Sequence, residues 1–379
     1  MSRLRILHLG KYYAPVRGGI ETVVETLCRG ETVWADSSAL VLNKGLFTTL
    51  ERVDDVDVRR VGSVATVGAV SLAPTLPLWL SRAQADVLVL HEPNPMALVA
   101  YFIARPSIPL VVWYHSEVIR PAWKYRLLYE PLLEFALRRA ARIVVASPPM
   151  RDVPALRAYR DKCAVVPFGL RLERYAEGAH AQRRIGTRPT FLFVGRLVGY
   201  KGLDVLLKAL RGLDAETVII GDGPLRGALE QMAAALALRD RVRFLGEVTA
   251  DQLLAWYHAC DALVLPSVTR QEAFGMVQLE AMLCGRPVIS TDLATGVSWV
   301  NQHGQTGLVV PPGDVSELRQ ALVRLIENRD LRLRLGAAAR ARVLAHFTAE
   351  RMCSATRSLY QDVISGGSSA TRAEPAAVA

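Results

Sequence analysis

Short apolar runs alternate with longer stretches of helical periodicity along nearly the whole 379-residue chain. Apolar runs closed by Gly, Asp or Pro are typical of strands buried on both faces of a parallel sheet, and the longer stretches are typical of the helices that cover it. In the first half, the predicted strands are Leu4–Leu9, Ala39–Leu42, Val56–Val61, Val87–Leu90, Leu110–Tyr114, Ile143–Ala146 and Ala164–Val166. The alternation predicts an α/β fold.

The pattern stops over residues 171–189, which are polar and Arg-rich, and restarts at Thr190. The strands predicted beyond this linker are Thr190–Val194, Val218–Ile220, Val242–Leu245, Ala262–Leu265, Pro287–Ser290 and Gly307–Val310. Helices are predicted at 20–28, 202–210, 225–237 and 315–347, followed by one that ends at Ile364. Two similar halves predict two Rossmann-like α/β/α domains whose parallel sheets face across a central, ligand-binding cleft.

The domain boundaries follow from the same pattern. We expect an N-terminal acceptor-binding domain over residues 1–180 and a C-terminal nucleotide-sugar-binding domain over 181–345. Residues 346–365 are predicted to form a helix that packs back on the first domain. The Ser-, Ala- and Gly-rich residues 366–379 are predicted to be a disordered tail.

Composition narrows the class of protein. With 51% hydrophobic and 22% charged residues, the chain is neither disordered nor fibrous. Its five scattered cysteines contain no C-x-x-C pair, which favours a reducing compartment. No apolar run approaches the ~20 residues of a membrane span. We therefore expect a cytoplasmic protein, either soluble or peripheral on the inner face of the cell membrane.

The net charge of +10 is concentrated in the first half, where 25 Lys and Arg face 17 Asp and Glu up to residue 185. Residues 120–142 carry six cations and only two acids, interleaved with Trp, Tyr, Phe and Leu. Such a basic amphipathic stretch predicts contact with an anionic membrane or a lipid pyrophosphate. The alternative is a helix packed on its own domain with a solvated basic face.

Two glycine loops follow predicted strands. Gly18 and Gly19 precede a helix, where backbone N–H groups and the helix dipole favour a phosphate. Gly221 opens a second loop, Gly221-Asp222-Gly223-Pro224, which reads as a strand-to-helix turn that lines the cleft. Neither loop has the dinucleotide spacing, so a nicotinamide cofactor is not indicated. An ordinary tight turn remains the alternative for Gly18-Gly19, and binding of a nucleotide base is the alternative role near the second loop.

Arg196 and Lys201 flank a glycine-containing loop at the end of the strand Thr190–Val194. Arg can hold a diphosphate with two hydrogen bonds while Lys adds a point charge, so the pair suits a diphosphate. The alternative is two solvated surface charges. His115 follows the predicted strand Leu110–Tyr114, and this position predicts a side chain that points into the cleft. The alternative is a structural histidine.

The segment Glu272-Ala273-Phe274-Gly275-Met276-Val277-Gln278-Leu279-Glu280 carries the most specific pattern. Eight positions at 3.6 residues per turn would bring Glu272 and Glu280 to nearly one face. The first carboxylate could then accept hydrogen bonds from sugar hydroxyls and the second from a ribose. Phe274, Gly275 and Met276 would offer backbone N–H groups at a helix start. The alternative is a helix with acids in its first turns.

Taken in order, these segments resemble glycosyltransferase family 4, the retaining GT-B enzymes. The resemblance rests on Gly18-Gly19, Val112–Ser116, Val165–Gly169, Val194–Leu197 with Lys201-Gly202, Gly221–Pro224 and Glu272–Val288. It covers nearly the whole chain, weakly over 20–100 and strongly over 110–315. The usual Gly-His-Glu-Val turn after the first helix is missing.

The resemblance implies a role for each matching residue. Arg196 and Lys201 would hold the donor diphosphate, with the N–H of Gly19 beside them. Glu272 and the backbone of 274–276 would position the donor sugar, Glu280 the ribose, and His115 would lie near the reacting face of the sugar. Family members need no metal and no cofactor, since Arg and Lys stabilise the leaving pyrophosphate.

The resemblance therefore predicts a retaining hexosyltransferase in cell-surface polysaccharide synthesis. Its partners would be a nucleotide-sugar donor, with GDP-mannose favoured, and a glycan or polyprenyl-linked acceptor. UDP-glucose, UDP-galactose and UDP-N-acetylglucosamine remain open as donors. The rivals are a GT-B protein of another reaction type, such as a sugar-nucleotide epimerase or a phosphorylase, and a non-enzymatic nucleotide or nucleic-acid binder. Nucleic acid is not an expected partner.

Overall fold

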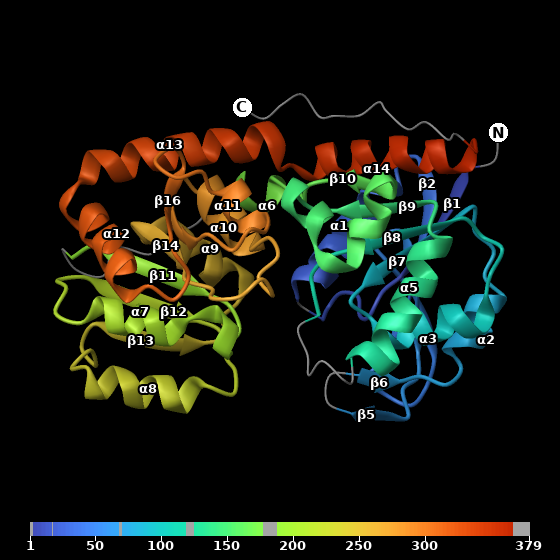
Figure 1. Ribbon diagram of the computed structural model, residues 1–379, viewed down its shortest axis with the longest axis horizontal. Coiled ribbons are helices and arrows are strands. Elements are labelled where there is room, and N and C mark those ends of the chain that lie inside the picture. Colours follow the sequence, from blue (N-terminus) through green and yellow to red (C-terminus); the bar gives the residue numbers. More distant parts are fainter. Residues whose placement is uncertain (1–2, 17, 68–69, 119–124, 177–187, 367–379) are drawn as a thin grey trace. The chain divides into compact units, whose positions relative to one another are not determined.

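The computed structural model describes residues 3–16, 18–67, 70–118, 125–176 and 188–366. The chain divides into two compact units (Figure 1). Unit 1 comprises Met1–Gly169 together with Ala349–Ala379, and unit 2 comprises Leu170–Thr348. The first division lies earlier in the chain than the predicted boundary after residue 180. The predicted tail lies outside the described residues, apart from Gly366.

Unit 1 is built on an eight-stranded sheet of order β10-β9-β8-β7-β1-β2-β4-β3. Its strands are β1 (Leu4–Leu9), β2 (Ala35–Leu42), β3 (Thr49–Val53), β4 (Val56–Val61), β7 (Val87–Glu92), β8 (Leu110–Tyr114), β9 (Arg142–Val145) and β10 (Cys163–Val165). Neighbouring strands are parallel except the β3–β4 pair, which is antiparallel. All seven predicted strands of this half are confirmed, with bounds that shift by a few residues.

Three strands of unit 1 were not predicted from the sequence. The edge strand β3 has four exposed residues among its five, so it lacks the apolar run of a buried strand. A separate two-stranded sheet pairs β5 (Ala65–Val67) with β6 (Val70–Leu72). Strands this short carry too few residues for a clear alternation.

Helices cover the unit 1 sheet. They are α1 (Gly19–Glu31), α2 (Leu76–Ser81), α3 (Pro95–Ala104), α5 (Glu130–Arg139) and α14 (Ala349–Ile364), with a π-helical turn η1 (Tyr125–Tyr129) and 3₁₀ turns η2 (Pro148–Asp152) and η3 (Pro154–Lys162). The C-terminal helix α14 packs against α1 at Gly30, where a Cβ would meet the Cys353 sulfur at 2.3 Å. The guanidinium of Arg357 also lies 5.4 Å from the ring centre of Trp34. The last helix of the chain is thus part of unit 1.

Unit 2 has a six-stranded parallel sheet of order β13-β12-β11-β14-β15-β16. Its strands are β11 (Thr190–Val194), β12 (Glu216–Ile220), β13 (Val242–Gly246), β14 (Ala262–Leu265), β15 (Val288–Thr291) and β16 (Gly307–Val310). Its helices are α6 (Glu173–Ala176), α7 (Leu203–Leu210), α8 (Arg226–Ala235), α9 (Ala250–Ala259), α10 (Met276–Leu283), α11 (Gly296–Val300), α12 (Val315–Glu327) and α13 (Arg329–His346), with a 3₁₀ turn η4 (Gly199–Lys201). Phe191, Phe193 and Ile219 are fully buried in its main apolar core.

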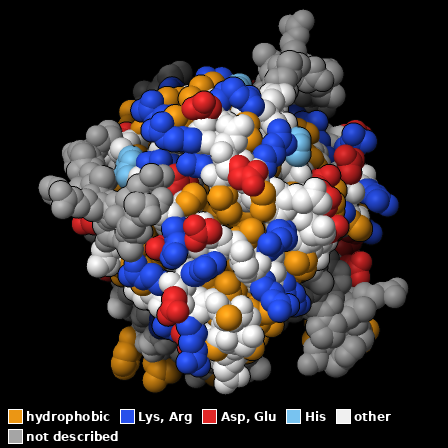
Figure 2. All heavy atoms as spheres, turned by 90° about the vertical axis from the view of Figure 1, so that its left-hand side faces the viewer, with side chains coloured by type: hydrophobic (Ala, Val, Ile, Leu, Met, Phe, Trp, Pro, Cys, Tyr) orange, Lys and Arg blue, Asp and Glu red, His pale blue; other side chains and the backbone are white. Residues whose placement is uncertain are grey.

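Two sequence expectations for unit 2 need correction. Helix α6 lies inside the predicted linker, whose residues 177–187 fall outside the described part. The single helical pattern over 315–347 is two helices, because Asn328 ends α12 and caps α13 by accepting a hydrogen bond from the Leu331 N–H at 2.8 Å. Figure 2 shows one face of unit 2, on which basic and acidic side chains are interspersed.

Candidate active site

Arg196 and Lys201, the two cations predicted to hold the diphosphate, differ in burial. Both follow β11, with Arg196 exposed and Lys201 only 7% exposed. Lys201 ends the η4 turn, and Gly202 follows it with φ 66°, where a Cβ would meet the Pro266 carbonyl oxygen at 2.1 Å. The glycine therefore lets this turn lie directly on the chain that leaves β14.

Lys201 and Glu272 form a buried ion pair between Nζ and Oε2. The Ser267 hydroxyl donates to the same oxygen at 2.9 Å, and the Thr295 hydroxyl donates to the Glu272 carbonyl oxygen at 2.9 Å. Burial is the largest influence on the pKa of Lys201 and lowers it, but the charge and hydrogen bond of Glu272 together with Tyr200 outweigh burial, so the pKa lies above its ordinary value. The site thus keeps a fixed cation at the carboxyl ends of β11 and β14.

The loop before α10 is shaped by Gly275. Its φ is 72°, a conformation that favours glycine, and a Cβ there would also meet Leu265 Cδ2 at 2.6 Å. Phe274 is buried, and its ring packs against Trp299 and Phe347 with centres 6.5 and 6.0 Å away. Only the backbone of Phe274 is therefore suited to a ligand. Met276 begins α10, where N–H groups have no partner within the helix.

Helical spacing cannot place Glu272 and Glu280 on one face, because α10 begins at Met276 and Glu272 lies in the loop before it. Glu280 instead accepts a hydrogen bond from the Tyr257 hydroxyl of α9 at 2.5 Å. Burial raises the pKa of Glu280, while hydrogen bonds from Tyr257 and Tyr175 lower it. Tyr175 belongs to α6, so the start of the predicted linker is held by unit 2.

Gly221 is explained by close packing. Its φ is 122°, and a Cβ would meet the Gly195 carbonyl oxygen at 2.1 Å. Gly223 approaches the Leu197 carbonyl oxygen in the same way, at 2.5 Å, and the Leu197 N–H bonds the Asp222 carbonyl oxygen at 2.9 Å. The glycines bring the loops after β11 and β12 into direct contact, which places Gly221 beside the loop of Arg196.

In unit 1, α1 begins at Gly19, and Gly18 is the N-cap residue before it. A Cβ on Gly19 would meet nothing within 4 Å, so its backbone faces open space. The Thr22 N–H already bonds the Gly18 carbonyl oxygen at 2.9 Å, which leaves the N–H groups before it without a helical partner.

His115 follows β8 and is 3% exposed. Its backbone N–H bonds the Glu92 carbonyl oxygen at 2.9 Å, and its ring stacks on Phe168 with centres 5.3 Å apart. Burial lowers its pKa to about 3, so the ring is neutral at ordinary pH. Its Nε2 lies 2.9 Å from Nδ1 of His91, which is also buried.

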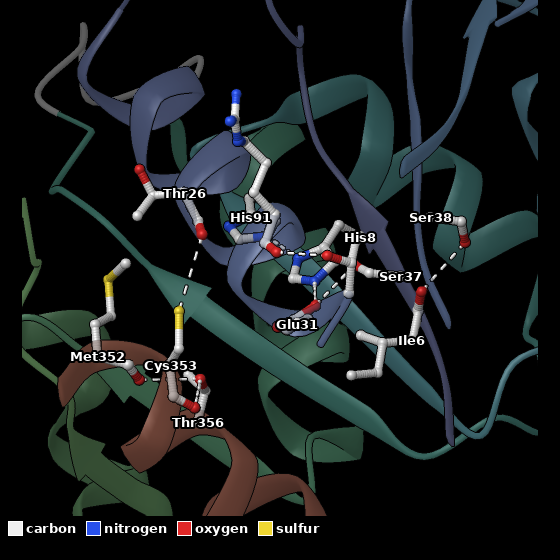
Figure 3. A network of polar contacts seen from close by, with 12 residues as sticks. Ile6, His8, Thr26, Glu31, Ser37, Ser38, His91, Met352, Cys353 and Thr356 are labelled. Atoms are coloured by element: carbon white, nitrogen blue, oxygen red, sulfur yellow. Dashed lines mark hydrogen bonds and ion pairs between the residues drawn. The ribbon is translucent and has the colours of Figure 1, made fainter. Parts of the chain in front are cut away.

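Sequence reasoning missed several buried polar residues of unit 1. His91 is hydrogen-bonded to His8, and His8 is hydrogen-bonded to Glu31; these contacts are part of the network in Figure 3. Glu92 is the last residue of β7 and accepts hydrogen bonds from the Tyr129 hydroxyl at 2.6 Å and the Asn94 N–H at 2.9 Å. Burial raises the pKa of Glu92 to about 8. The one signal was a polar residue inside an apolar run, as with His8 in β1.

The basic stretch 120–142 is described only from residue 125 onwards, and side chains only from 127. Leu127 and Leu128 are each 68% exposed. Arg138 pairs with Glu134 at 2.9 Å, and Arg139 bonds the Tyr101 hydroxyl at 3.1 Å. Part of this basic charge is thus held against unit 1 itself. Among the described helices, none has the length and apolar character that crossing a membrane requires.

Two Rossmann-like units, each built on a mainly parallel sheet, are the fold of GT-B glycosyltransferases, and comparisons with known proteins show that class. The chain belongs to the glycosyltransferases: residues 177–342 match the family "Glycosyl transferases group 1", and residues 17–169 match the glycosyl transferase 4-like domain.

Its relatives include the D-rhamnosyltransferase WbpZ of Pseudomonas aeruginosa, 38% identical over 91% of this chain and 93% of that protein. The O-antigen chain mannosyltransferase C of Escherichia coli is 32% identical over 95% and 99%. Among solved structures, the sucrose-phosphate synthase of Thermosynechococcus elongatus matches with a TM-score of 0.81 and 21% identity, over 96% of this chain and 100% of that one. This last likeness concerns the fold alone.

Proposed function

We propose that the protein is a retaining, metal-independent hexosyltransferase that uses GDP-mannose and acts in cell-surface polysaccharide synthesis. The observation that carries this proposal is the buried cation Lys201, which is held by Glu272 and lies in the loop that also bears the exposed Arg196. When the sugar leaves, negative charge develops on the diphosphate. Cations already fixed at that place stabilise it without reorganisation, which is the role that a metal has in other enzymes.

Each residue of unit 2 then has a task. The exposed Arg196 would bind the diphosphate with two hydrogen bonds, and the buried Lys201 would add a second positive charge. Glu272 uses Oε2 for Lys201 and Ser267, so Oε1 is the oxygen that would accept from a sugar hydroxyl. Glu280 would bind the ribose in exchange for one of its tyrosine hydrogen bonds.

The sugar is proposed from the relatives. One relative is a mannosyltransferase of an O-antigen chain and another is a D-rhamnosyltransferase. D-Rhamnose is D-mannose without the 6-hydroxyl, so one pocket shape suits both sugars. GDP-linked D-rhamnose is therefore the second candidate donor. The acceptor would be a hydroxyl of a glycan or of a lipid-linked oligosaccharide.

We also propose that unit 1 contacts the inner face of the cell membrane through residues 120–142. The exposed Leu127 and Leu128 support this contact, since apolar side chains beside basic ones are typical of peripheral membrane segments. A lipid-linked acceptor would then be presented at the surface where the enzyme is bound.

The diphosphate assignment is tested by replacing Arg196 with Ala and measuring GDP affinity by calorimetry in EDTA. Arg196 is exposed, so its loss leaves no buried charge. Lys201 is less suitable, because its removal would leave the Glu272 carboxylate buried without its cation, at a cost of ~3–5 kcal/mol in stability. We expect Arg196→Ala to weaken GDP binding about 10- to 100-fold, the loss of hydrogen bonds to a charged group.

The matched control is Arg239→Ala, which removes the same charge from another exposed position of unit 2. This variant should bind GDP as the wild type does. Equal GDP affinity of the Arg196→Ala variant and the wild type would contradict the role of Arg196 in binding the diphosphate. GDP binding that needs a divalent metal would contradict the metal-independent mechanism.

A further inference from the structure

Three buried histidines form a continuous line across unit 1. Nδ1 of His8 lies 2.9 Å from Nε2 of His91, and Nδ1 of His91 lies 2.9 Å from Nε2 of His115. The residues come from β1, from β7 and from the end of β8, and they are 0%, 1% and 3% exposed. Successive rings are stacked with centres 5.2 Å apart. Each bond joins one ring nitrogen to another, so one of each pair must donate and the other accept.

The two ends of the line differ. At one end, Nε2 of His8 bonds Oε2 of Glu31 at 2.7 Å, and the Ser37 hydroxyl donates to the same oxygen at 2.8 Å (Figure 3). At the other end, Nδ1 of His115 has no hydrogen-bond partner among the described residues. An ionised carboxylate only accepts, so the Glu31 end fixes a proton on Nε2 of His8.

Proton counting then leaves two states. If His8 is a cation, its Nδ1–H donates to His91, whose Nδ1–H donates to His115, and Nδ1 of His115 carries a proton. If His8 is neutral, its Nδ1 accepts from Nε2–H of His91, whose Nδ1 accepts from Nε2–H of His115. Nδ1 of His115 is then a bare lone pair. One proton at His8 thus changes the free atom of His115 from donor to acceptor.

We propose that Glu31, acting through His8 and His91, holds His115 in the state whose Nδ1–H donates to an oxygen of the bound substrate. This inference rests on the proposed transferase function, together with the expectation from the family resemblance that His115 lies near the reacting face of the sugar. Glu31, His8 and His91 are positioning residues, since none of them touches substrate.

Charges around the line favour the cationic state of His8. Burial lowers the pKa of His8, but interactions with Cys28 and Glu31 outweigh it and raise the pKa well above its ordinary value. Burial and the neighbouring histidines lower the pKa of His91, and burial lowers that of His115 to about 3. The proton therefore stays on His8.

The groups around His8 come from several elements. They are Cys28 and Glu31 of α1, Ser37 of β2 and His91 of β7, with Cys353 and Tyr360 of α14 close to Glu31 and Cys28. As the pH rises through the pKa of His8, the cation is lost and the whole line reverses. Removing the Glu31 charge should bring that reversal to lower pH.

The test is a pH titration of the full-length protein with ¹⁵N-labelled histidine, followed by NMR, because protonated and bare ring nitrogens differ strongly in ¹⁵N shift. We expect Nδ1 of His115 to carry a proton in the wild type at pH 7. In Glu31→Gln, the signals of His8, His91 and His115 should change together at a lower pH than in the wild type. A His115→Gln variant assigns the signal of His115.

Glu25→Gln is the matched control, because Glu25 lies on α1 but pairs with Arg29. Its titration should follow that of the wild type. If Glu31→Gln fails to fold, Cys28→Ala tests whether the pKa of His8 falls, because this variant keeps Glu31 and all three histidines in place. A bare Nδ1 on His115 in the wild type at pH 7, or independent titration of the three rings, would overturn the proposal.

Turnover gives a second readout. In Glu31→Gln, kcat at pH 8–9 should fall about tenfold, the worth of one hydrogen bond, with little change in KM for the donor. The same substitution should have no further effect in a His115→Gln background. The NMR result needs no substrate. A reversing line in a protein that transfers no sugar would therefore refute only the transferase, and normal transfer with independent rings would refute only the relay.

Discussion

At the scale of single residues, buried polar groups mark the candidate functional residues within each unit. In unit 2 they neutralise each other, as Lys201 does with Glu272. In unit 1 they leave atoms without a partner among the described residues, such as Nδ1 of His115 and Oε1 of Glu92. A buried polar atom without a partner destabilises the fold, so its retention fits a group that meets a ligand.

Glu92 gives a pH-dependent prediction. Its pKa in the folded protein is raised from 4.5 to about 8, so its contribution to stability is fully present below pH 4.5 and is lost as the pH rises through 8. Glu92→Gln mimics the protonated acid at every pH. The variant should match the wild type at pH 4.5 and become more stable than it by pH 9, by up to about tenfold in the unfolding equilibrium per pH unit of that window.

Urea unfolding at the two pH values measures this difference. Glu130→Gln, at an exposed position of the same unit, is the control for charge loss alone. A Glu92→Gln variant whose stability relative to the wild type is the same at pH 4.5 and pH 9 would show that folding does not raise the pKa of Glu92.

Single residues also show which contacts could not be predicted from the sequence. Lys201 and Glu272 were each predicted as ligands of the donor, but their direct pairing depends on β11 and β14 being neighbours in the sheet. His8, His91 and Glu31 went unnoticed because each is a single polar residue, and only the β1–β7 register brings the first two together. Their roles, like those predicted for His115, Arg196 and Glu280, stay predictions until tested.

At the scale of elements, apolar patterning was sufficient for every buried strand. Thr190–Val194 and Ala262–Leu265 were predicted with the bounds that the structure has, because all their residues are buried and flanked by polar turns. The exposed edge strand Thr49–Val53 was missed for the opposite reason. The split between α12 and α13 depends on a cap at Asn328, a local hydrogen bond that periodicity does not reveal.

Helix packing in unit 2 makes a second stability prediction. Gly336 of α13 lies against the turn at Gly285, whose carbonyl oxygen would be 2.1 Å from an added Cβ. Gly336→Ala should therefore destabilise the unit by about 1–3 kcal/mol, although Ala favours helices, because backbone on both sides has to move. Thermal unfolding of the full-length protein measures the effect.

Gly227 supplies the matched control, since it lies in α8 and a Cβ there would meet nothing within 4 Å. Gly227→Ala should stabilise the unit by about 0.5–1 kcal/mol through helix propensity. A Gly336→Ala variant that is stabilised to the same degree would mean that α13 does not pack on the Gly285 turn as described.

At the scale of the whole molecule, the distribution of basic charge bears on the acceptor, whereas the fold bears on the class of enzyme. The basic excess lies in the first half of the sequence, whereas the second half carries 21 Lys and Arg against 19 Asp and Glu. Basic charge on unit 1 suits an acceptor carried by an anionic lipid surface. The GT-B fold and the family were predictable from ordered motifs alone. The donor base, the sugar and the acceptor were not, since they depend on side chains that no motif specifies.

The most direct test of the account is a donor screen with purified full-length protein. GDP-mannose, GDP-D-rhamnose and the common UDP-sugars would each be incubated in EDTA with a crude lipid extract, and release of GDP or UDP followed. We expect release from a GDP-linked manno-configured donor, unaffected by EDTA and increased by the extract. Release from UDP-sugars only, or release that requires a divalent metal, would contradict the proposed donor or the metal-free mechanism.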